Sequence, residues 1–253
     1  MKNSHLLLSL LFLLGFASTG VGEMTGINKE SKTREQILRE FPKLTVGNIE
    51  ESPIKGLYEV MAGDNIFYWS KEGYVIFGEM YSKDGVAMTV EKRKKLWNAK
   101  ASRIPLAKAL RIGCGRNVVI EFTDPDCPYC RKVNLFLSKR KDVTRYIFLY
   151  PIARLHKDST NKAAFILSAR DKVQAHDDVY SGRYDSSPLP RQSDASLELA
   201  KDSIGIALAV GIPGTPVLWV NGTFVNGADM HLIASLLDKK TGGEKAGTLP
   251  GVL

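Results

Sequence analysis

Cysteine is scarce in this chain of 253 residues, which contains three. Cys127 and Cys130 form one CxxC pair, and Cys114 is left without a close partner. A second CxxC pair is absent, and the four histidines have no ligand spacing, so the sequence does not predict a zinc site and we expect no metal. An odd number of cysteines is also unusual for a framework of structural disulfides.

Long apolar runs are absent beyond the N-terminal region. Residues 1–22 carry a single charge at Lys2, an apolar stretch from Leu6 to Ala17, and then small residues, which is the layout of a cleavable secretory signal peptide. An uncleaved membrane anchor is the alternative, but the stretch is shorter than the roughly 20 residues that a span needs. We therefore predict export to the oxidising periplasm as a soluble protein.

Strong charge of one sign is lacking as well, because the net charge is only +8. Basic residues gather in 91–100 and 138–142, but no recognition motif or pattern of aromatic interleaving accompanies them. We interpret these runs as solvated helix faces and expect no nucleic-acid partner.

Residues 23–90 predict a small α+β domain. An amphipathic helix is expected within 28–43, with Ile37, Leu38 and Phe41 on one side. Short β-branched and aromatic runs separated by turn residues then predict an antiparallel meander, with strands within 44–61, 65–70, 73–82 and 86–90. A domain of this size is marginal alone, so we expect an edge strand to pair with a second copy and form a homodimer.

Residues 91–110 are rich in lysine and alanine and predict a helical linker, kinked or ended near Pro105. The remainder, 111–253, alternates between strand and helix patterns and predicts an α/β domain with a crossover between parallel strands and a helical insertion. Its expected elements are strands at 117–122 and 144–152, helices at 127–139, 159–180, 195–210 and 230–240, and a hairpin within 211–227.

The spacing of the CxxC pair fits redox chemistry if Cys127 begins a helix with Pro128 in its first position. Residues three apart share a helix face, close enough to form a disulfide. The first-turn amides and the helix dipole would stabilise a Cys127 thiolate, while Cys130, one turn further in, would be shielded and placed to resolve a mixed disulfide. A structural disulfide is the alternative, although such a short loop would stabilise the fold little.

The segment "GIPGTPVLWVNG" is the second informative motif. Pro216 directly precedes a β-branched and aromatic run, so the Thr215–Pro216 bond is a candidate for a cis peptide. A cis bond would turn the Thr215 backbone outward, where it could pair with an extended substrate segment. An ordinary trans turn, or a cis bond at Pro213, is equally compatible with the sequence.

Together, "FTDPDCPYC", the helical insertion and "GTPVLWVNG" resemble the thioredoxin-fold domain of the periplasmic disulfide isomerases of the DsbC/DsbG type. "SPIKGLYEVMAGDNIFYWSKEGYVIFGEMYSKDG" resembles their cystatin-like N-terminal dimerisation domain. The resemblance covers essentially the whole chain after the signal peptide. It implies a homodimer in which linker helices hold two catalytic domains, with no bound cofactor.

The resemblance assigns roles to individual residues. Cys127 matches the family's nucleophile and Cys130 its resolving cysteine. It also implies a substrate-binding surface, which comprises Thr215, Pro216, Pro128 and Tyr129. Glu121 matches a buried carboxylate that handles the Cys130 proton in thioredoxin and eukaryotic isomerases; a glutamate on the solvent side of the strand is the alternative.

Two features depart from the family pattern. The dipeptide between the cysteines is Pro-Tyr rather than the Gly-Tyr of DsbC, which puts the balance of isomerase and reductase activity in doubt. No cysteine follows Cys130, so the structural disulfide of the insertion has no counterpart. Cys114 is extra, and we expect it to be a buried apolar thiol rather than a regulatory one.

We therefore predict an exported thiol–disulfide isomerase that rearranges incorrect disulfides in exported clients. The family implies re-reduction by a membrane thiol reductase of the DsbD type. A dedicated reductase, or a DsbG-like guardian of single cysteines, would reduce well but isomerise poorly. A dimeric holdase chaperone would keep its activity without Cys127 and Cys130.

Overall fold

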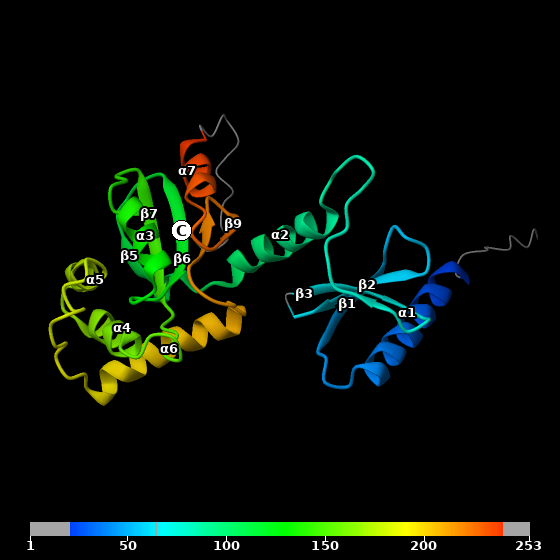
Figure 1. The fold of residues 1–253 in the computed structure, drawn as a ribbon, viewed down its shortest axis with the longest axis horizontal. Coiled ribbons are helices and arrows are strands. Elements are labelled where there is room, and N and C mark those ends of the chain that lie inside the picture. Colours follow the sequence, from blue (N-terminus) through cyan, green and yellow to red (C-terminus); the bar gives the residue numbers. More distant parts are fainter. Residues whose placement is uncertain (1–20, 64, 240–253) are drawn as a thin grey trace, which may run out of the picture. The chain divides into compact units, whose positions relative to one another are not determined.

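The computed structural model describes residues 21–63 and 65–239, which form two compact units divided between Phe77 and Gly78. The expected signal peptide, 1–22, lies outside the described residues except for its last two. Among the described helices, none is long and apolar enough to cross a bilayer. Figure 1 labels the helices and strands of the two units.

The N-terminal unit is a helix packed on an antiparallel meander, as predicted. Helix α1 (Val21–Glu40) precedes four strands in the spatial order β1-β2-β3-β4, each antiparallel to the next. The strands are β1 (Val46–Glu51), β2 (Leu57–Ala62), β3 (Asn65–Ser70) and β4 (Val75–Ile76). Ile37 of α1 is fully buried against Val60 and Trp69 of the sheet, so this core joins the helix to the central strands.

Two local predictions in this region are wrong. Leu38 lies on the exposed side of α1, about 100° around the helix from the fully buried Ile37. Residues 86–90 do not form a strand; Met88 instead begins helix α2 (Met88–Lys100), which lies in the C-terminal unit. The β-branched residues Thr89 and Val90 suggested a strand, but helix formation buries Thr89 and lets its hydroxyl accept from the Met80 amide at 2.8 Å.

Residues 91–110, predicted to be a helical linker, form the rest of α2, two short 3-10 turns and the start of a strand. Helix α2 ends at Lys100, and two 3-10 turns follow, Ala101–Arg103 and Leu106–Lys108. Trp97 stacks on Phe224 at a centroid separation of 4.5 Å and its carbonyl accepts a hydrogen bond from the Trp219 indole at 2.9 Å. Aromatic packing therefore makes the end of α2 an integral part of the C-terminal unit.

The C-terminal unit is built on a five-stranded mixed sheet in the order β5-β7-β6-β8-β9. Strands β6 and β7 are parallel and the other neighbouring pairs are antiparallel. The strands are β5 (Leu110–Ile112), β6 (Asn117–Thr123), β7 (Val143–Leu149), β8 (Val217–Val220) and β9 (Thr223–Asn226). Strand β5 was not predicted; it starts at the last residue of the expected linker and pairs with β7 as an edge strand.

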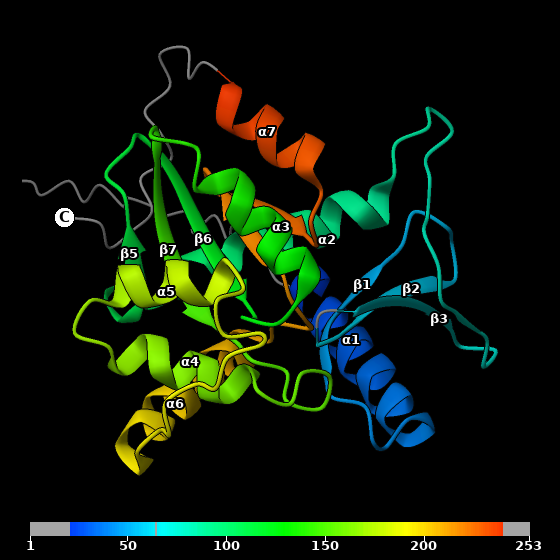
Figure 2. The ribbon, with the colours of Figure 1, turned by 60° about the vertical axis from the view of Figure 1, so that its left-hand side comes forward.

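Helices cover both faces of this sheet. The helices are α3 (Pro128–Leu137), α4 (Ser159–Ser168), α5 (Lys172–Tyr180), α6 (Asp194–Val210) and α7 (Met230–Asp238). Helix α3 is the crossover between β6 and β7 and shares a core with α7, whereas α6 packs with the end of α2 on the opposite face. Helices α4 and α5 form the insertion, and α4 lies beside α6 (Figure 2). This is a thioredoxin fold with a helical insertion, as predicted.

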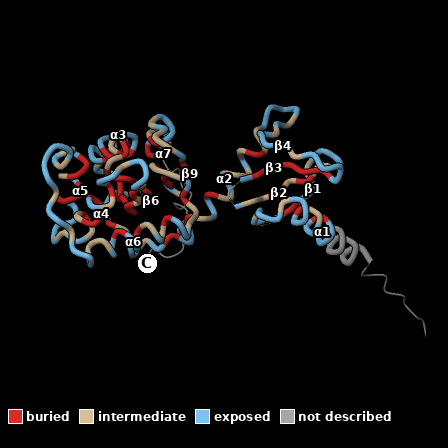
Figure 3. The backbone as a smooth tube through the Cα atoms, turned by 60° about the horizontal axis from the view of Figure 1, so that its bottom comes forward, coloured by how far each residue is buried: buried red, intermediate tan, exposed pale blue. Residues whose placement is uncertain are grey.

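Strand β6 is the central strand, and its alternation divides the core. Ile120 and Phe122 face the α2 and α6 side, where Phe122 stacks on Phe148 of β7 at 4.9 Å between ring centroids. Val119 faces α3 and α7. Buried residues follow the central strands of each unit (Figure 3). The loop after β6, which leads to the CxxC pair at the start of α3, therefore starts from a buried central strand.

Candidate active site

Cys127 is the N-cap of α3, and Pro128 occupies the first helical turn, as predicted. Proline is suited to this position because its missing amide would have no helical partner there. Cys127 is 6 % exposed and its thiol lies 3.7 Å from the carbonyl oxygen of Thr215. The sulfur thus lies at the N-terminal end of α3, between this helix and the loop that precedes β8.

The pKa of Cys127 is lowered to about 6, from an ordinary value of 9.0. The largest cause is a hydrogen bond from the Cys130 side chain; burial opposes the shift, and the amides of Cys130 and Tyr129 reinforce it. These donors stabilise the thiolate but not the neutral thiol. Cys127 is therefore a preformed nucleophile at neutral pH.

Cys130 lies one turn further along α3 and is 1 % exposed. Burial, and then its hydrogen bond to Cys127, raise the Cys130 pKa far above the ordinary range of a thiol. Its sulfur accepts a hydrogen bond from the Asp124 amide at 3.3 Å. The two thiols, which are both free here, therefore have opposite acidities: Cys127 is ionised near neutrality, whereas Cys130 stays protonated.

The Thr215–Pro216 peptide bond is cis, as the sequence suggested, and Pro213 is trans. Thr215 is partly exposed and Pro216 is buried at the start of β8. Strand β8 pairs with β6, whose C-terminal end leads to Cys127. This pairing brings two segments of the sequence that are far apart, the CxxC loop and the "GTPV" loop, to the same end of the sheet.

Glu121 is buried on the α3 side of β6, not on a solvent face. Its carboxylate accepts a hydrogen bond from the Arg145 guanidinium of β7 at 2.8 Å, and Arg145 is itself 4 % exposed. Glu121 and Arg145 thus form a buried pair, and removing either side chain would leave its partner buried without a counter-charge.

A second buried carboxylate, Asp124, lies directly after β6. It accepts the Ile152 amide at 2.7 Å and the Asp126 amide at 2.9 Å, and its other contact is the His156 ring at 3.0 Å. Since the Asp124 amide also donates to the Cys130 sulfur, this residue fixes the turn that carries both cysteines. Asp124 therefore positions the dithiol through its backbone and its side chain.

A hydroxyl pair lies beneath the dithiol. The Thr123 and Tyr180 hydroxyls are 2.9 Å apart, and the Thr123 side chain also hydrogen-bonds Cys130. Burial, the largest cause, raises the Tyr180 pKa well above its ordinary value, so Tyr180 stays neutral. The ring of His176 stacks on Tyr180 at 4.3 Å between centroids.

Sequence comparison identifies both units. Residues 26–90 match the profile of the "Disulfide bond isomerase protein N-terminal domain", and residues 106–229 match that of the "Thioredoxin-like domain". The chain is 31% identical over 191 residues to the probable thiol:disulfide interchange protein DsbC of Bordetella avium, an alignment covering 74% of this chain and 66% of the relative. It is 28% identical to DsbC of Escherichia coli K12, over 71% of this chain and 75% of that protein.

The chain belongs to the DsbC family. Among solved structures, a disulfide interchange protein of Neisseria gonorrhoeae is 30% identical over 52% of this chain and 94% of that one, with a TM-score of 0.44. Helicobacter pylori DsbG is 20% identical over 74% of this chain and 97% of that one, with a TM-score of 0.39. The family makes the protein a thiol–disulfide oxidoreductase with a thioredoxin-like catalytic domain.

In this DsbC-family protein, the structure brings most of the predicted site residues together. Cys127, Cys130, Pro128 and Tyr129 share the start of α3, and Thr215 meets Cys127 across the site. Pro128 and Tyr129 are exposed, with 63 % of Tyr129 accessible, so both can contact a client. Their roles in substrate binding stay predictions.

Cys114 is exposed, so the prediction that it is a buried apolar thiol is wrong. It lies between Gly113 and Gly115 in the turn from β5 to β6. A Cβ on Gly115 would come within 1.9 Å of the Asp142 carbonyl carbon, which shows how closely this turn approaches the loop before β7. The backbone is packed there, and the side chain between the glycines is directed outward.

Asp124, Arg145, Thr123 and Tyr180 were not singled out from the sequence. Asp124 and Thr123 stand within the quoted "FTDPDCPYC" motif, and polar residues at the end of a buried strand are a usable signal. Arg145 and Tyr180 have no such local signal, because only the folded sheet and insertion bring them to the dithiol. Within residues 21–63 and 65–239, no group of histidine, cysteine and carboxylate side chains could hold a metal ion.

Proposed function

We propose that this protein is an exported disulfide isomerase that acts through the Cys127 thiolate. The observation that carries the proposal is the difference between the two thiols: Cys127 is ionised near neutrality and 6 % exposed, while Cys130 is protonated and 1 % exposed. An isomerase needs a nucleophile that attacks readily and a second thiol that reacts only afterwards.

The reaction begins when the Cys127 thiolate attacks one sulfur of a client disulfide. A new disulfide forms between Cys127 and the client, and the other client sulfur leaves as a thiolate. That thiolate can attack a different client disulfide, form a new client disulfide and release another client thiolate. The released thiolate then attacks the mixed disulfide and displaces Cys127, which returns unchanged. Isomerisation therefore consumes no electrons.

A second outcome uses Cys130. Once Cys127 is joined to the client, the Cys130 thiol loses its proton and attacks the Cys127 sulfur. A Cys127–Cys130 disulfide forms and the client leaves reduced, so two electrons have passed to it. Glu121 is the base we assign to the Cys130 proton. A membrane thiol reductase of the DsbD type would then return two electrons to the dithiol.

The Thr215 backbone is the client-binding edge in this proposal. Its carbonyl lies beside the nucleophile, so an extended client segment that pairs with this edge would present its disulfide to Cys127. The exposed Tyr129 and Pro128 would contact the same segment from α3. Backbone pairing recognises no particular sequence, which suits an enzyme with many misoxidised exported clients.

Homodimerisation through the N-terminal unit is part of the proposal. Strand β4 is a short edge strand, and Tyr74, Ile76 and Phe77 at this edge are strongly exposed, with Phe77 at 80 %. An apolar sheet edge left in water is a template for pairing with another strand, and a second copy supplies the same edge. We expect Ile76→Lys to convert the dimer to monomers in sedimentation analysis; a variant that stays dimeric would contradict this interface.

Reactivation of a scrambled enzyme with several non-consecutive disulfides, in glutathione buffer, tests the function. Wild type should restore activity rapidly, and Cys127→Ser should not. Cys114→Ser is the matched control, because that thiol lies outside the site. If wild type is as slow as Cys127→Ser but still reduces insulin, the protein is a dedicated reductase. Suppression of client aggregation that survives loss of Cys127 and Cys130 would indicate a chaperone.

A further inference from the structure

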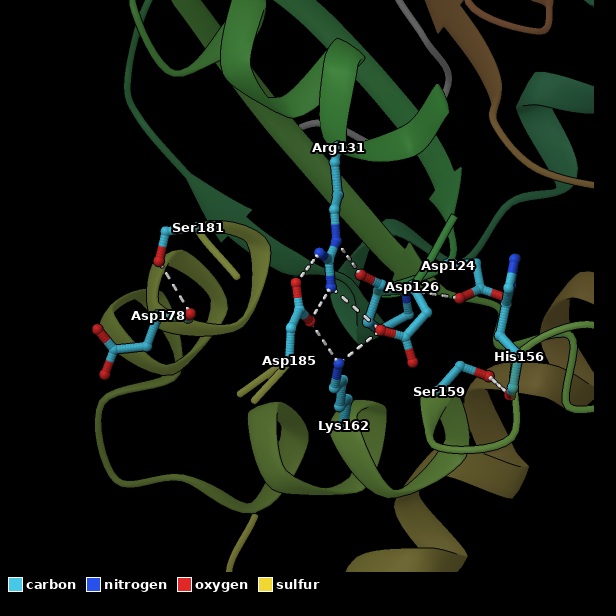
Figure 4. Close-up of polar contacts among 10 residues, drawn as sticks. Asp124, Asp126, Arg131, His156, Ser159, Lys162, Asp178, Ser181 and Asp185 are labelled. Atoms are coloured by element: carbon cyan, nitrogen blue, oxygen red, sulfur yellow. Dashed lines mark hydrogen bonds and ion pairs between the residues drawn. The ribbon is translucent and has the colours of Figure 1, made fainter. Parts of the chain in front are cut away.

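Four charged side chains form a closed cluster beside the nucleophile, the Asp126 cluster, which consists of Asp126, Arg131, Lys162 and Asp185. Arg131 bonds both carboxylates, at 3.1 Å to Asp126 and 2.7 Å to Asp185. Lys162 bonds the same two carboxylates, at 2.5 and 2.8 Å. Figure 4 shows Arg131 and Lys162 approaching the two acids from opposite sides. Each acid thus has two cations and each cation has two acids.

The cluster joins the dithiol to the insertion. Asp126 directly precedes Cys127, and Arg131 directly follows Cys130. Lys162 comes from α4 and Asp185 from the loop between α5 and α6. The Arg131 Nε also donates to the Pro125 carbonyl at 2.8 Å, so its guanidinium holds the backbone of the nucleophile loop as well as the acid.

The cluster is shielded enough for its charges to matter. The Lys162 side chain is 6 % exposed and that of Asp126 is 17 % exposed. Burial alone would lower the Lys162 pKa, but its hydrogen bonds to Asp126 and Asp185 raise it. Hydrogen bonding from Arg131, the largest cause, drives the Asp185 pKa far below its usual range. The cluster pairs two cationic side chains with two acidic ones, so its formal charges sum to zero.

The negative charge of an aspartate next to a nucleophilic cysteine opposes catalysis. A carboxylate near a thiol disfavours the thiolate, because two negative charges then lie close together. We propose that Arg131 and Lys162 are positioning residues for the Cys127 reaction: they hold the Asp126 carboxylate toward α4 and neutralise it, so that Cys127 can ionise beside it. This inference rests on the proposed role of Cys127 as nucleophile.

The other charges around the dithiol have partners of their own. Glu121 of β6 pairs with Arg145 of β7, and Asp124 contacts His156 from the loop before α4. Tyr180 of α5 stays neutral. Among the described ion pairs, Arg131 and Lys162 therefore pair with Asp126 and Asp185 and with no other acid near the dithiol.

The sign of each variant follows from the net charge that it leaves. Arg131→Met or Lys162→Met leaves the cluster at −1 and should raise the Cys127 pKa, by about half to one unit for a nearby like charge. Asp126→Asn leaves +1 and should lower it. The double variant Asp126→Asn/Arg131→Met is neutral and should restore the wild-type value, and Arg131→Lys should preserve it.

The measurement is the pH dependence of thiolate ultraviolet absorbance in the full chain, in a Cys114→Ser background and without client. Near-ultraviolet circular dichroism checks folding. Arg140→Met is the matched control, because Arg140 also pairs with two carboxylates, those of Asp142 and Asp238. Arg140 lies beyond the C-terminus of α3, and that end of the helix is about 15 Å along its axis from Cys127. It should leave the Cys127 pKa unchanged.

The proposal is overturned if folded Arg131→Met and Asp126→Asn both leave the Cys127 pKa where it is, or if Arg140→Met moves it as far as Arg131→Met. Should Lys162→Met fail to fold, the Arg131 and Asp126 variants decide. Failure of the proposed function is distinguishable, because the titration involves no client: a wild type that cannot isomerise but shows these opposite shifts refutes the isomerase activity and supports the charge compensation.

Discussion

The Cys127 thiol lies 3.7 Å from the carbonyl oxygen of Thr215, a residue 88 positions away in the chain. One residue begins a helix and the other precedes a strand, and the pairing of β6 with β8 brings them together. A client disulfide bound along the Thr215 edge would therefore meet a nucleophile that is already ionised.

The reactivity of Cys127 should follow its thiolate. Because the Cys127 pKa is lowered to about 6, the rate of alkylation by iodoacetamide should rise with pH around a midpoint near 6 and level off above it. The reduced protein should also gain stability, relative to Cys127→Ser, as the pH rises from about 6 toward 9.0.

The sign of that stability change follows from proton binding. Between these two pH values the unfolded chain keeps the Cys127 proton while the folded one has lost it, so raising the pH favours folding. Cys130 stays protonated throughout this range and adds nothing. A midpoint near 9, with no pH-dependent difference between wild type and Cys127→Ser, would contradict the stabilised thiolate.

The three thiols should differ in accessibility. In the native reduced protein, mass spectrometry after brief alkylation should find Cys127 and Cys114 modified and Cys130 protected, because Cys130 is 1 % exposed. Denaturation should add the third label. Cys114→Ser should change the free energy of unfolding by no more than about 0.5 kcal/mol, as is usual for an exposed position. Rapid native labelling of Cys130 would refute its assignment as the shielded thiol.

Replacing only one residue of the Glu121–Arg145 pair should strongly lower the free energy of unfolding. Arg145→Met leaves the Glu121 carboxylate buried without its cation, and we expect a loss of about 3–5 kcal/mol in unfolding free energy. The double variant Glu121→Leu/Arg145→Leu should lose less, because no unpaired charge remains. Chemical denaturation measures both, and equal losses in the single and double variants would show that the pair contributes by packing alone.

Trp97 should stabilise the C-terminal unit rather than act as a free linker residue. It is 4 % exposed and packs on Phe224 and Trp219, so Trp97→Ala should cost about 3–5 kcal/mol. Lys95→Ala, an exposed change in the same helix, is the control and should cost far less. Thermal unfolding followed by tryptophan fluorescence distinguishes them. Similar small losses in both variants would mean that α2 does not belong to this core.

Two glycines should respond oppositely to alanine. Gly115→Ala places a Cβ 1.9 Å from the backbone of Asp142, and we expect a loss of about 3 kcal/mol or more. Gly205 lies exposed within α6 with open space around it, so Gly205→Ala should stabilise by about 0.5–1 kcal/mol. Denaturant midpoints measure both, and a tolerated Gly115→Ala would show that this turn moves freely.

Local sequence predicted much of the fold. The CxxC loop, the proline at the start of α3 and the cis bond at Pro216 each depend on residue types whose backbone preferences are intrinsic. Residues 86–90 are the instructive failure: β-branched residues are compatible with a strand, but burial of Thr89 and its bond to Met80 favoured a helix start. Secondary-structure propensity is weak enough for such contacts to override it.

The sequence by itself determined which residue types carry the chemistry: a dithiol at helix spacing, a proline-capped strand, and an acid within the preceding apolar strand. Only the tertiary structure decided their surroundings. Glu121 faces Arg145 because β6 and β7 are parallel neighbours, and Asp126 meets Lys162 because the insertion folds back on the nucleophile loop. Backbone conformation depends on neighbouring residues in the chain, whereas charge pairing and burial depend on residues that only folding brings together.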